Sequence, residues 1–151
     1  MKHVLSFLLC LFIFSLSAQE SEKDDVQRTI ETFFEGFHQQ DSMKIKQTVS
    51  DEIVMRRIST DSAGKAFVRQ QDFPDFLNMI VSIPKTTQFR EIIKSYSIRI
   101  DGPMAQVWTP YEFRFNGEFD HCGTNSFQLF KEDRDWKIIY IIDTGRKEGC
   151  D

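Results

Sequence analysis

Hydrophobic and polar residues alternate along four runs between residues 89 and 146, as expected for strands with one buried face. Three turn sequences separate the runs: Asp101-Gly102-Pro103, Asn116-Gly117 and the polar stretch 131–135. Alternating runs joined by short turns are typical of antiparallel strands. The C-terminal part of the chain therefore predicts one continuous antiparallel meander.

The segment before the meander has helical spacing instead. Apolar residues recur over 24–39 at Val26, Ile30, Phe33, Phe34 and Phe37, which gives a stripe wide enough to pack on a sheet. The other elements expected before residue 89 are a helix from Asp41 or Ser42 to about residue 49, a strand over 53–58 and a helix over 73–82 capped by Asp72. Between them, residues 59–71 show no clear pattern apart from a loop at Ala63-Gly64-Lys65. Helices followed by strands predict an α+β domain, with three helices on one face of a curved sheet.

The first 18 residues resemble an export signal. Lys2 precedes an apolar run over residues 4–14, and small residues follow it up to Ala18. The apolar run is shorter than the roughly 20 residues of a membrane-spanning helix, so we expect no membrane span. Cleavage after Ala18 would leave residues 19–151 as a single domain in the periplasm or outside the cell. A buried N-terminal helix is the alternative.

The composition excludes several function classes. The net charge is −4 and no basic cluster is present that could neutralise several phosphates, so nucleic acid is not an expected partner. Beyond the signal segment only His38 and His121 remain, without the spacing of a metal site, and we expect no metal or other cofactor. The sequence also lacks a Gly-x-Ser-x-Gly nucleophile motif.

The strand register follows from making the apolar faces agree, because a slip of one residue would turn a face inside out. A three-residue loop, Asn116-Gly117-Glu118, pairs Phe113 with His121. Pairing Leu129 with Ile138 in the next hairpin then places His121 beside Arg146. One inner face results: Tyr96, Ile98, Val107, Thr109, Tyr111, Phe113, His121, Asn125, Phe127, Tyr140, Ile142, Thr144 and Arg146.

This inner face is apolar at one end and polar at the other, which is the usual form of a small-ligand pocket. The predicted ligand-binding residues are Tyr96, Thr109, Tyr111, His121, Asn125, Tyr140, Thr144 and Arg146. His121 and Tyr111 are the candidate catalytic residues, and a purely structural histidine is the alternative. The register turns the carboxylates of Glu112, Asp120 and Asp143 to the opposite face, although a bulge at Pro110 would reverse this for Glu112.

Adjacent arginines stand in the first predicted strand. Because side chains alternate along a strand, either Arg56 or Arg57 faces the helices or the pocket, where a guanidinium suits a carboxylate ligand. The alternative is a solvated pair at the sheet edge. Trp108 falls on the outer face, where an exposed indole favours a back-to-back homodimer. The alternative is a bulge at Pro110 that turns Trp108 inward, in which case no exposed indole would favour a dimer.

Cys122 and Cys150 remain after the signal segment, and export would place them in an oxidising compartment. The register sets Cys122 near Gly145, so the tail needs to fold back only once for the two sulfurs to meet. This favours an intramolecular disulfide. Two free thiols or an interchain bond are the alternatives.

The order helix, helix, short strand, helix and long meander resembles the nuclear transport factor 2-like (SnoaL and ketosteroid isomerase-like) superfamily. Residues 105–113 (AQVWTPYEF) and 116–124 (NGEFDHCGT) are similar to small exported members from Bacteroidetes-type bacteria, and 135–139 (DWKII) and 142–146 (IDTGR) complete a resemblance that covers residues 24–147. The resemblance implies a cone-shaped α+β roll. It carries no assigned activity.

The superfamily also contains acid–base enzymes that work inside the cone, but their motifs are not matched. The isomerase pattern implies a tyrosine in the first helix and an aspartate in the first strand, where this chain has Phe33, Phe34 and Phe37, and Arg56-Arg57-Ile58. The leading hypothesis is therefore a non-catalytic module that encloses a small, partly apolar ligand. An anionic group on this ligand would meet Arg146 or His121. The alternatives are an acid–base enzyme that uses His121 and a dimeric interaction protein that uses the outer sheet face.

Overall fold

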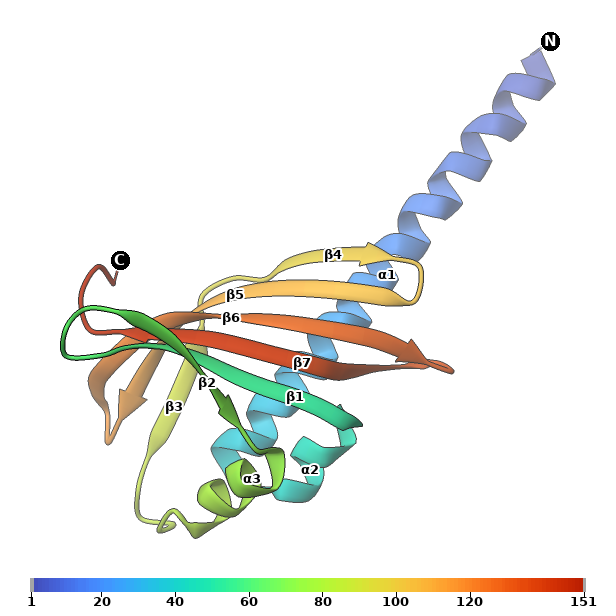
Figure 1. The fold of residues 1–151 in the computed structure, drawn as a ribbon. Helices are drawn as coiled ribbons and strands as arrows, with labels where there is room; N and C mark the ends of the chain where they lie inside the picture. Colours follow the sequence, from blue (N-terminus) through green and yellow to red (C-terminus); the bar gives the residue numbers. More distant parts are fainter. Residues whose placement is uncertain (1, 151) are drawn as a thin grey trace.

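The computed structural model describes the backbone of residues 2–150 and the side chains of residues 20–150. Its elements are α1 (Lys2–Gln39), α2 (Ser42–Gln47), β1 (Val49–Thr60), β2 (Ala66–Gln71), α3 (Phe73–Ser82), β3 (Phe89–Ile93), β4 (Ser97–Asp101), β5 (Met104–Phe115), β6 (Glu118–Glu132) and β7 (Asp135–Arg146). The helices lie together on one face of a curved, mainly antiparallel sheet (Figure 1). The predicted α+β roll is confirmed.

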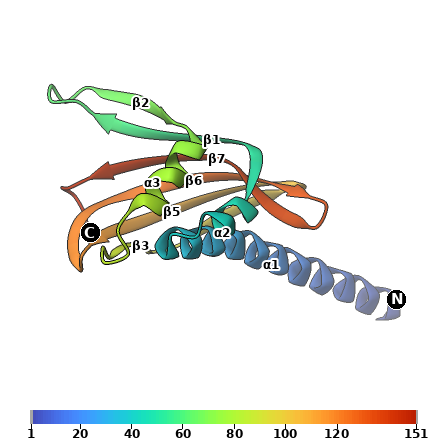
Figure 2. The same ribbon diagram turned by 90° about the horizontal axis from the view of Figure 1, so that it is seen from below.

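Helix α1 packs on the sheet through the predicted stripe. Val26, Ile30, Phe33 and Phe34 are all buried, and the rings of Phe33 and Phe34 contact Phe127 of β6. The N-terminal part of α1 projects beyond the sheet (Figures 1 and 2). The predicted signal segment and its cleavage after Ala18 fall among residues whose side chains are not described. Within the described residues, no helix has both the length and the apolar character needed to cross a membrane.

The two short helices begin where the caps predict. The Asp41 carboxylate accepts from the backbone N–H groups of Met43 and Lys44, and Asp72 accepts from that of Asp75. Helix α3 has the predicted bounds and buries Phe76, Leu77 and Ile80. Helix α2 ends at Gln47, before the predicted limit, because Val49 already belongs to β1.

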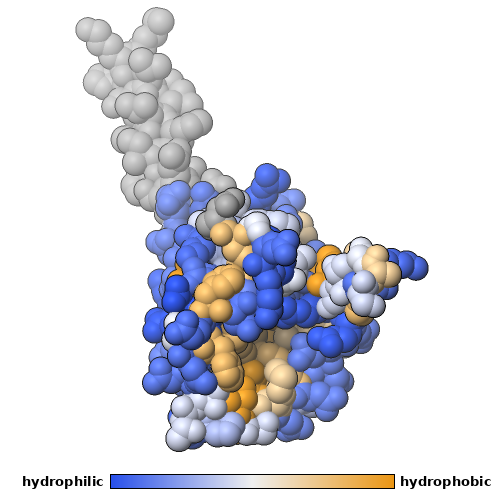
Figure 3. Space-filling model, turned by 90° about the vertical axis from the view of Figure 1, so that its left-hand side faces the viewer, coloured by the Kyte–Doolittle hydropathy of each residue, from blue (hydrophilic) through white to orange (hydrophobic). Residues whose placement is uncertain are grey.

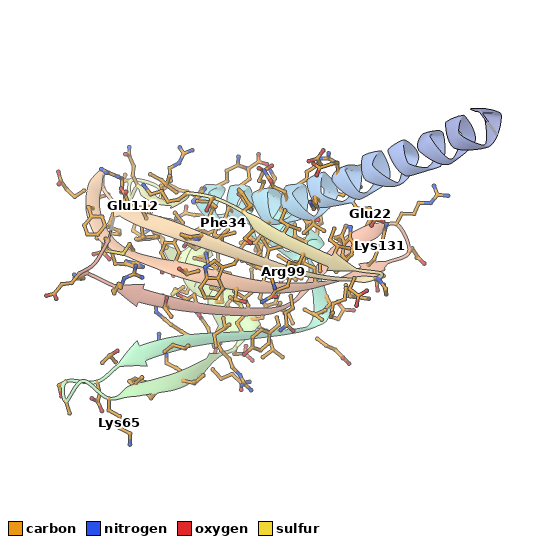
Figure 4. All side chains as sticks on the ribbon, turned by 90° about the horizontal axis from the view of Figure 1, so that it is seen from above. Glu22, Phe34, Lys65, Arg99, Glu112 and Lys131 are labelled. Carbon is orange, nitrogen blue, oxygen red and sulfur yellow. A yellow bond between two sulfur atoms is a disulfide. The ribbon has the colours of Figure 1, made fainter. Side chains whose placement is uncertain are left out.

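The strands run in the order β2-β1-β7-β6-β5-β3, with β4 paired to the first part of β5. Only β1 and β7 pair in parallel among these neighbours. Two expectations were wrong. The strand expected over 53–58 is the longer β1, and it forms a hairpin with β2, a strand that was not predicted. The loop expected at residues 63–65 is confirmed as the turn of this hairpin, and Lys65 stands at its tip, away from the body (Figure 4). The first run of the meander is also divided into β3 and β4.

The β5–β6 hairpin keeps the predicted pairing through a different turn. Phe115 pairs with Glu118 across a two-residue loop, and Arg114 pairs with Phe119. A bulge then inserts Asp120 as an extra residue, so that Phe113 pairs with His121 as expected. The pairs Thr109–Asn125 and Val107–Phe127 are also confirmed.

The β6–β7 hairpin departs from the predicted register. Leu129 pairs with Ile138 as expected, but Gln128 pairs with Tyr140, which leaves Ile139 as an extra residue in β7. Every later pair is shifted by one position. The inner face of β7 therefore carries Ile141, Asp143 and Gly145, while Tyr140, Ile142, Thr144 and Arg146 belong to the outer face, contrary to prediction.

The core fills the end of the roll that lies under the middle of α1. Val107, Phe127, Leu129 and Ile138 are inaccessible to solvent there, beneath Val26 and Ile30. Beyond this core, Lys131 of β6 bonds Glu22 of α1, with Nζ 2.6 Å from Oε1 (Figure 4). The β1–β2 and β5–β6 turns lie at the other end of the sheet (Figure 1).

Candidate functional site

A cavity of about 390 Å³ lies between the helices and the inner face of the sheet. This volume is within the range of small-molecule sites. Figure 3 faces this side of the molecule and shows apolar side chains gathered in a hollow with hydrophilic residues around it. The lining residues are Phe33, Phe34, Phe37, Met55, Arg57, Arg69, Gln71, Phe76, Met79, Ile80, Ile83, Phe89, Glu91, Tyr111, Phe113, Phe115, His121, Ile141 and Asp143.

Aromatic rings form the apolar wall. Phe33 and Phe37 of α1 are one helical turn apart, and both stack on Phe76 of α3, with ring centroids 6.3 and 6.1 Å away. Phe37 also meets Phe89 of β3 edge to face at 5.0 Å. Ring contacts of this kind stabilise the wall beyond simple area burial. The helix stripe predicted as core therefore also furnishes the cavity.

The opposite wall carries an ion pair between neighbouring strands. Arg57 of β1 and Asp143 of β7 are partners in the parallel register, and their Nη1 and Oδ2 atoms are 3.0 Å apart. Burial raises the pKa of Asp143 above its usual range, although the Arg57 charge acts in the opposite direction. A Cβ atom at Gly145 would lie only 2.1 Å from Arg57 Nη2, so the bare glycine leaves space for the guanidinium.

Glu91 enters the cavity from the edge strand β3. Its Oε1 accepts a hydrogen bond from Asn125 Nδ2 at 2.6 Å, and Asn125 Nδ2 also lies 3.4 Å from Thr109 Oγ1. Its backbone N–H donates to His38 Nε2 of α1 at 2.9 Å. Desolvation of the inward-facing carboxyl raises the pKa of Glu91 to about 7 despite the Asn125 hydrogen bond. Glu91 is thus an acid that changes charge near neutral pH.

Tyr111 lies across Gly123, its partner on β6. The phenol donates to the Thr144 backbone carbonyl at 2.8 Å, and burial raises the pKa of Tyr111. A Cβ atom at Gly123 would lie 1.9 Å from the Thr144 carbonyl oxygen and 2.7 Å from the phenol. The hydrogen bond across the sheet therefore depends on glycine at this position.

His121 borders the cavity beside Tyr111 and Phe113. Its ring stacks on Phe113 at 4.9 Å and meets Tyr111 edge to face at 5.6 Å. His121 Nδ1 is 2.7 Å from Asp120 Oδ2, and this hydrogen bond lowers the pKa of Asp120. An ionised Asp120 accepts a hydrogen bond from the Nδ1–H group, which leaves Nε2 as the nitrogen with a free lone pair. Among the described residues, Nε2 has no hydrogen-bond partner.

The bulge at Asp120 explains why this carboxylate reaches His121. Adjacent residues in a regular strand point to opposite faces, which is the basis of the prediction that Asp120 turns away. As the extra residue of the bulge, Asp120 leaves that alternation and its carboxylate turns to the histidine. Glu112 does face outward, as predicted, and bonds Lys94 and Arg114.

The sequence-predicted site residues are only partly brought together. Tyr111 and His121 line the cavity, and Thr109 and Asn125 are buried behind Glu91. Tyr96 is partly buried against the core near Glu31 and does not line the cavity.

Three predicted ligand-binding residues lie on the outer face, because of the bulge at Ile139. Tyr140 lies under the Arg56 guanidinium at 6.0 Å. The Thr144 hydroxyl accepts from the Thr124 backbone N–H, and Arg146 donates to the Gly149 carbonyl. None of the three can reach a ligand in the cavity.

Three charged lining residues were not singled out from the sequence. Asp143 was predicted on the wrong face, and Arg69 belongs to a stretch for which the sequence predicted no element. Glu91 occupies an inward position in a strand whose other inward residues, Phe89 and Ile93, are apolar, and that alternation was the available signal. For the adjacent arginines, Arg57 is the one that faces the cavity.

The outer face holds the remaining predicted features. Cys122 and Cys150 form a disulfide, with their Cα atoms 5.7 Å apart. Trp108 is opposite Ser126 and 52% exposed, as predicted, without the inward turn that a bulge at Pro110 would have caused. Within residues 20–150, no group of three or more His, Cys, Asp or Glu side chains is arranged to hold a metal ion.

No protein-family model and no curated protein matches the sequence. The structure does match solved structures. An NTF2-like protein of unknown function from Shewanella baltica has 16% identity and a TM-score of 0.62, covering 85% of this chain and 96% of that one. A candidate dehydratase of the NTF2-like family from Streptomyces avermitilis has 11% identity and a TM-score of 0.64, covering 85% and 98%.

A protein of unknown function with a cystatin-like fold from Nostoc punctiforme is also similar, with 10% identity and a TM-score of 0.64 over 83% of this chain and 92% of that one. At these identities the likeness concerns the fold. The chain therefore has the NTF2-like fold, and its function has to be argued from its own site.

Proposed function

We propose that this chain, built on the NTF2-like fold, is an exported domain that binds a small, partly apolar molecule in the cavity between its helices and sheet. One observation carries the proposal: a cavity of about 390 Å³ with an aromatic wall faces a wall of Arg57, Glu91, Tyr111, His121 and Asp143. Apolar surroundings supply affinity for such a ligand, and a few directed polar groups orient it. The export signal predicted in residues 1–18 and the disulfide support a site outside the cytoplasm.

The uncharged fluorescent probe N-phenyl-1-naphthylamine tests the cavity without assuming a natural ligand. We expect saturable binding of one probe per chain, with fluorescence enhanced by the apolar environment. The same probe should raise the midpoint of thermal unfolding, since a ligand at a hundredfold excess over its dissociation constant stabilises by about 2.7 kcal/mol.

A blocking variant separates the cavity from other apolar surfaces. Met79 lines the cavity and is half-exposed, so Met79→Trp adds bulk at the opening without disturbing the core. Trp108→Ala removes an exposed aromatic from the outer face and serves as the matched control. Binding that survives in Met79→Trp and disappears in Trp108→Ala would place the probe on the outer face and refute the proposal.

An acid–base enzyme is the second candidate, and the geometry of His121 favours it. A general base needs a free nitrogen toward the substrate and a partner that orients the ring. His121 has both: Asp120 holds Nδ1 at 2.7 Å, and the ring borders the cavity. Deprotonation of a carbon acid inside the cavity is the reaction class that this arrangement suits.

Elimination of 5-nitrobenzisoxazole reports such a base, because proton abstraction from carbon is coupled to cleavage of its N–O bond. We expect the protein to accelerate this reaction and His121→Asn to lower the rate by about a hundredfold, at the lower end of the range attributed to general bases. Glu91→Gln tests the other inward base. Equal rates for wild type and His121→Asn would refute the enzyme candidate and leave the ligand-binding proposal standing.

A further inference from the structure

Two arginines face each other on the cavity side of the β1–β2 hairpin. Arg57 and Arg69 are direct partners in the antiparallel register, and both line the cavity. Side chains of directly opposed residues project from the same face of a sheet and lie close together. The pair therefore places two guanidinium groups on one side of the cavity, opposite the aromatic wall.

Among the described residues, one of these two cations forms an ion pair. Arg57 is bonded to Asp143 at 3.0 Å, and Arg69 has no ion-pair partner among the described residues. The lining groups that keep their charge near neutral pH are two arginines and one aspartate. Together they leave an excess of one positive charge. Glu91 adds little negative charge below neutral pH, because its pKa is raised to about 7.

We propose that the ligand is an amphipathic monocarboxylate whose carboxylate binds Arg69 and Arg57 while its apolar body lies among the phenylalanine rings. This inference rests on the proposed binding function and specifies its ligand class. A guanidinium presents N–H donors in a planar fork that fits the two oxygens of a carboxylate. The single uncompensated charge matches a monoanion.

Gly145 adds to the argument. Its missing side chain lets the Arg57 guanidinium lie against β7, where it reaches Asp143. Asp143 holds Arg57 in place, so that guanidinium is preorganised before a ligand arrives, which lowers the entropic cost of binding. Arg69, which is exposed on the edge strand β2, supplies the second contact.

Competition against bound N-phenyl-1-naphthylamine at pH 6 tests the ligand class with three probes of equal chain length: octanoate, octanol and octylamine. We expect octanoate to displace the dye with an affinity at least tenfold above that of octanol, the gain expected from a charge-assisted hydrogen bond. Octylamine, which is cationic, should bind more weakly than octanol. Octyl phosphate carries more negative charge than octanoate, and we expect its affinity for the cavity to be no higher than that of octanoate.

Matched arginine variants locate the carboxylate. Arg69→Gln should reduce the octanoate affinity about tenfold and leave octanol unchanged, and Arg69→Lys should retain part of the preference. Arg56→Gln is the control, because this neighbour of Arg57 lies over Tyr140 on the outer face. Arg57→Gln alone would leave Asp143 buried without a partner, so the double variant Arg57→Gln/Asp143→Asn is the suitable test of the second arginine.

The outcomes separate the two proposals. If the dye does not bind, the cavity proposal fails and the carboxylate proposal fails with it. If the dye binds but octanoate and octanol compete equally, or if Arg69→Gln and Arg56→Gln behave alike, only the carboxylate proposal is overturned. A preference for octanoate that depends on Arg69 supports both.

Discussion

The two ends of the roll are built from the same strands and the same helix but differ in content. Under the middle of α1, strands β5, β6 and β7 present Val107, Phe127 and Ile138, which are inaccessible to solvent. Toward the turns, β5, β6 and β7 present Tyr111, His121 and Asp143 around open space. One end contributes stability through close packing, and the other leaves the volume and the charges that a site requires.

This division means that substitutions at the two ends should have different consequences. At the packed end a lost side chain leaves a cavity that its neighbours cannot fill, whereas at the open end the space already exists. The charged groups of the open end are held by ion pairs and hydrogen bonds to neighbouring strands. Stability and binding should therefore be separable by mutation.

The largest expected effect is at the packed end. Phe127 is 0% exposed and contacts Phe33 and Phe34, so Phe127→Ala should lower the free energy of unfolding by about 3–5 kcal/mol. Phe115→Ala removes a ring that is 47% exposed at the open end and should cost less than about 1 kcal/mol. Urea unfolding of both variants measures the contrast. Similar losses would show that the open end is packed as tightly as the core.

Removal of the disulfide should destabilise the fold without altering the cavity. The bond joins residues 28 positions apart on the outer face, and loop-closure entropy assigns it about 3.6 kcal/mol. Cys122→Ser/Cys150→Ser should therefore unfold at lower urea concentration and bind N-phenyl-1-naphthylamine with unchanged affinity. Weaker probe binding by folded protein would contradict the separation of the two faces.

Two glycines near the cavity should respond differently to an added methyl group. Gly123→Ala would force Cβ against the Thr144 carbonyl oxygen and Tyr111, so we expect a loss of about 2 kcal/mol. Gly145→Ala meets the terminal atoms of the Arg57 side chain, which can move aside, and should cost less stability. It should instead weaken octanoate binding, because the guanidinium is displaced. Thermal unfolding and dye competition distinguish the two effects.

Glu91 and His38 should produce opposing effects of pH on stability. The pKa of Glu91 is raised from 4.5 to about 7, so between these values the native state binds more protons and stability falls as pH rises. The pKa of His38 is lowered from 6.5 to about 4, mainly by burial, so in that window the unfolded state binds more protons and stability rises with pH. From pH 4.5 to 6.5 the contributions of Glu91 and His38 to the pH dependence of the free energy of unfolding have opposite signs and nearly cancel.

Single variants should reveal each slope. Glu91→Gln should make stability increase with pH over pH 4 to 6.5, with a limiting slope of about 1.4 kcal/mol per pH unit. His38→Gln, which keeps an acceptor for the Glu91 backbone N–H, should make stability decrease between pH 4.5 and 7. Urea titrations at four pH values measure both. A flat profile in either variant would contradict the assigned protonation states.

The fold could be predicted from the sequence because its strongest signals are local. Helix α3 follows from its Asp72 cap and apolar spacing, and the β5–β6 pairing follows from alternation on both strands. Strand β7 could not be placed in register in the same way. Its segment Ile138-Ile139-Tyr140-Ile141-Ile142 is apolar at five successive positions, so periodicity gives no indication of where an extra residue enters.

The charged part of the site was missed for related reasons. Alternation assigns polar residues to the solvent face, so Glu91 gives a signal only if its inward position is accepted despite its charge. Arg69 belongs to a strand in which almost every residue is exposed, and such a strand has no burial pattern to recognise. Tertiary pairing with Arg57 is what places it at the cavity.

The extra residue at Ile139 gives the protein a short evolutionary route to a different specificity. Deletion of this one codon would restore regular alternation to the rest of β7 and rotate its inward positions by one. Thr144 and Arg146 would then enter the cavity, and Asp143 would leave it. A single in-frame event could thus replace an aspartate of the cavity wall with an arginine.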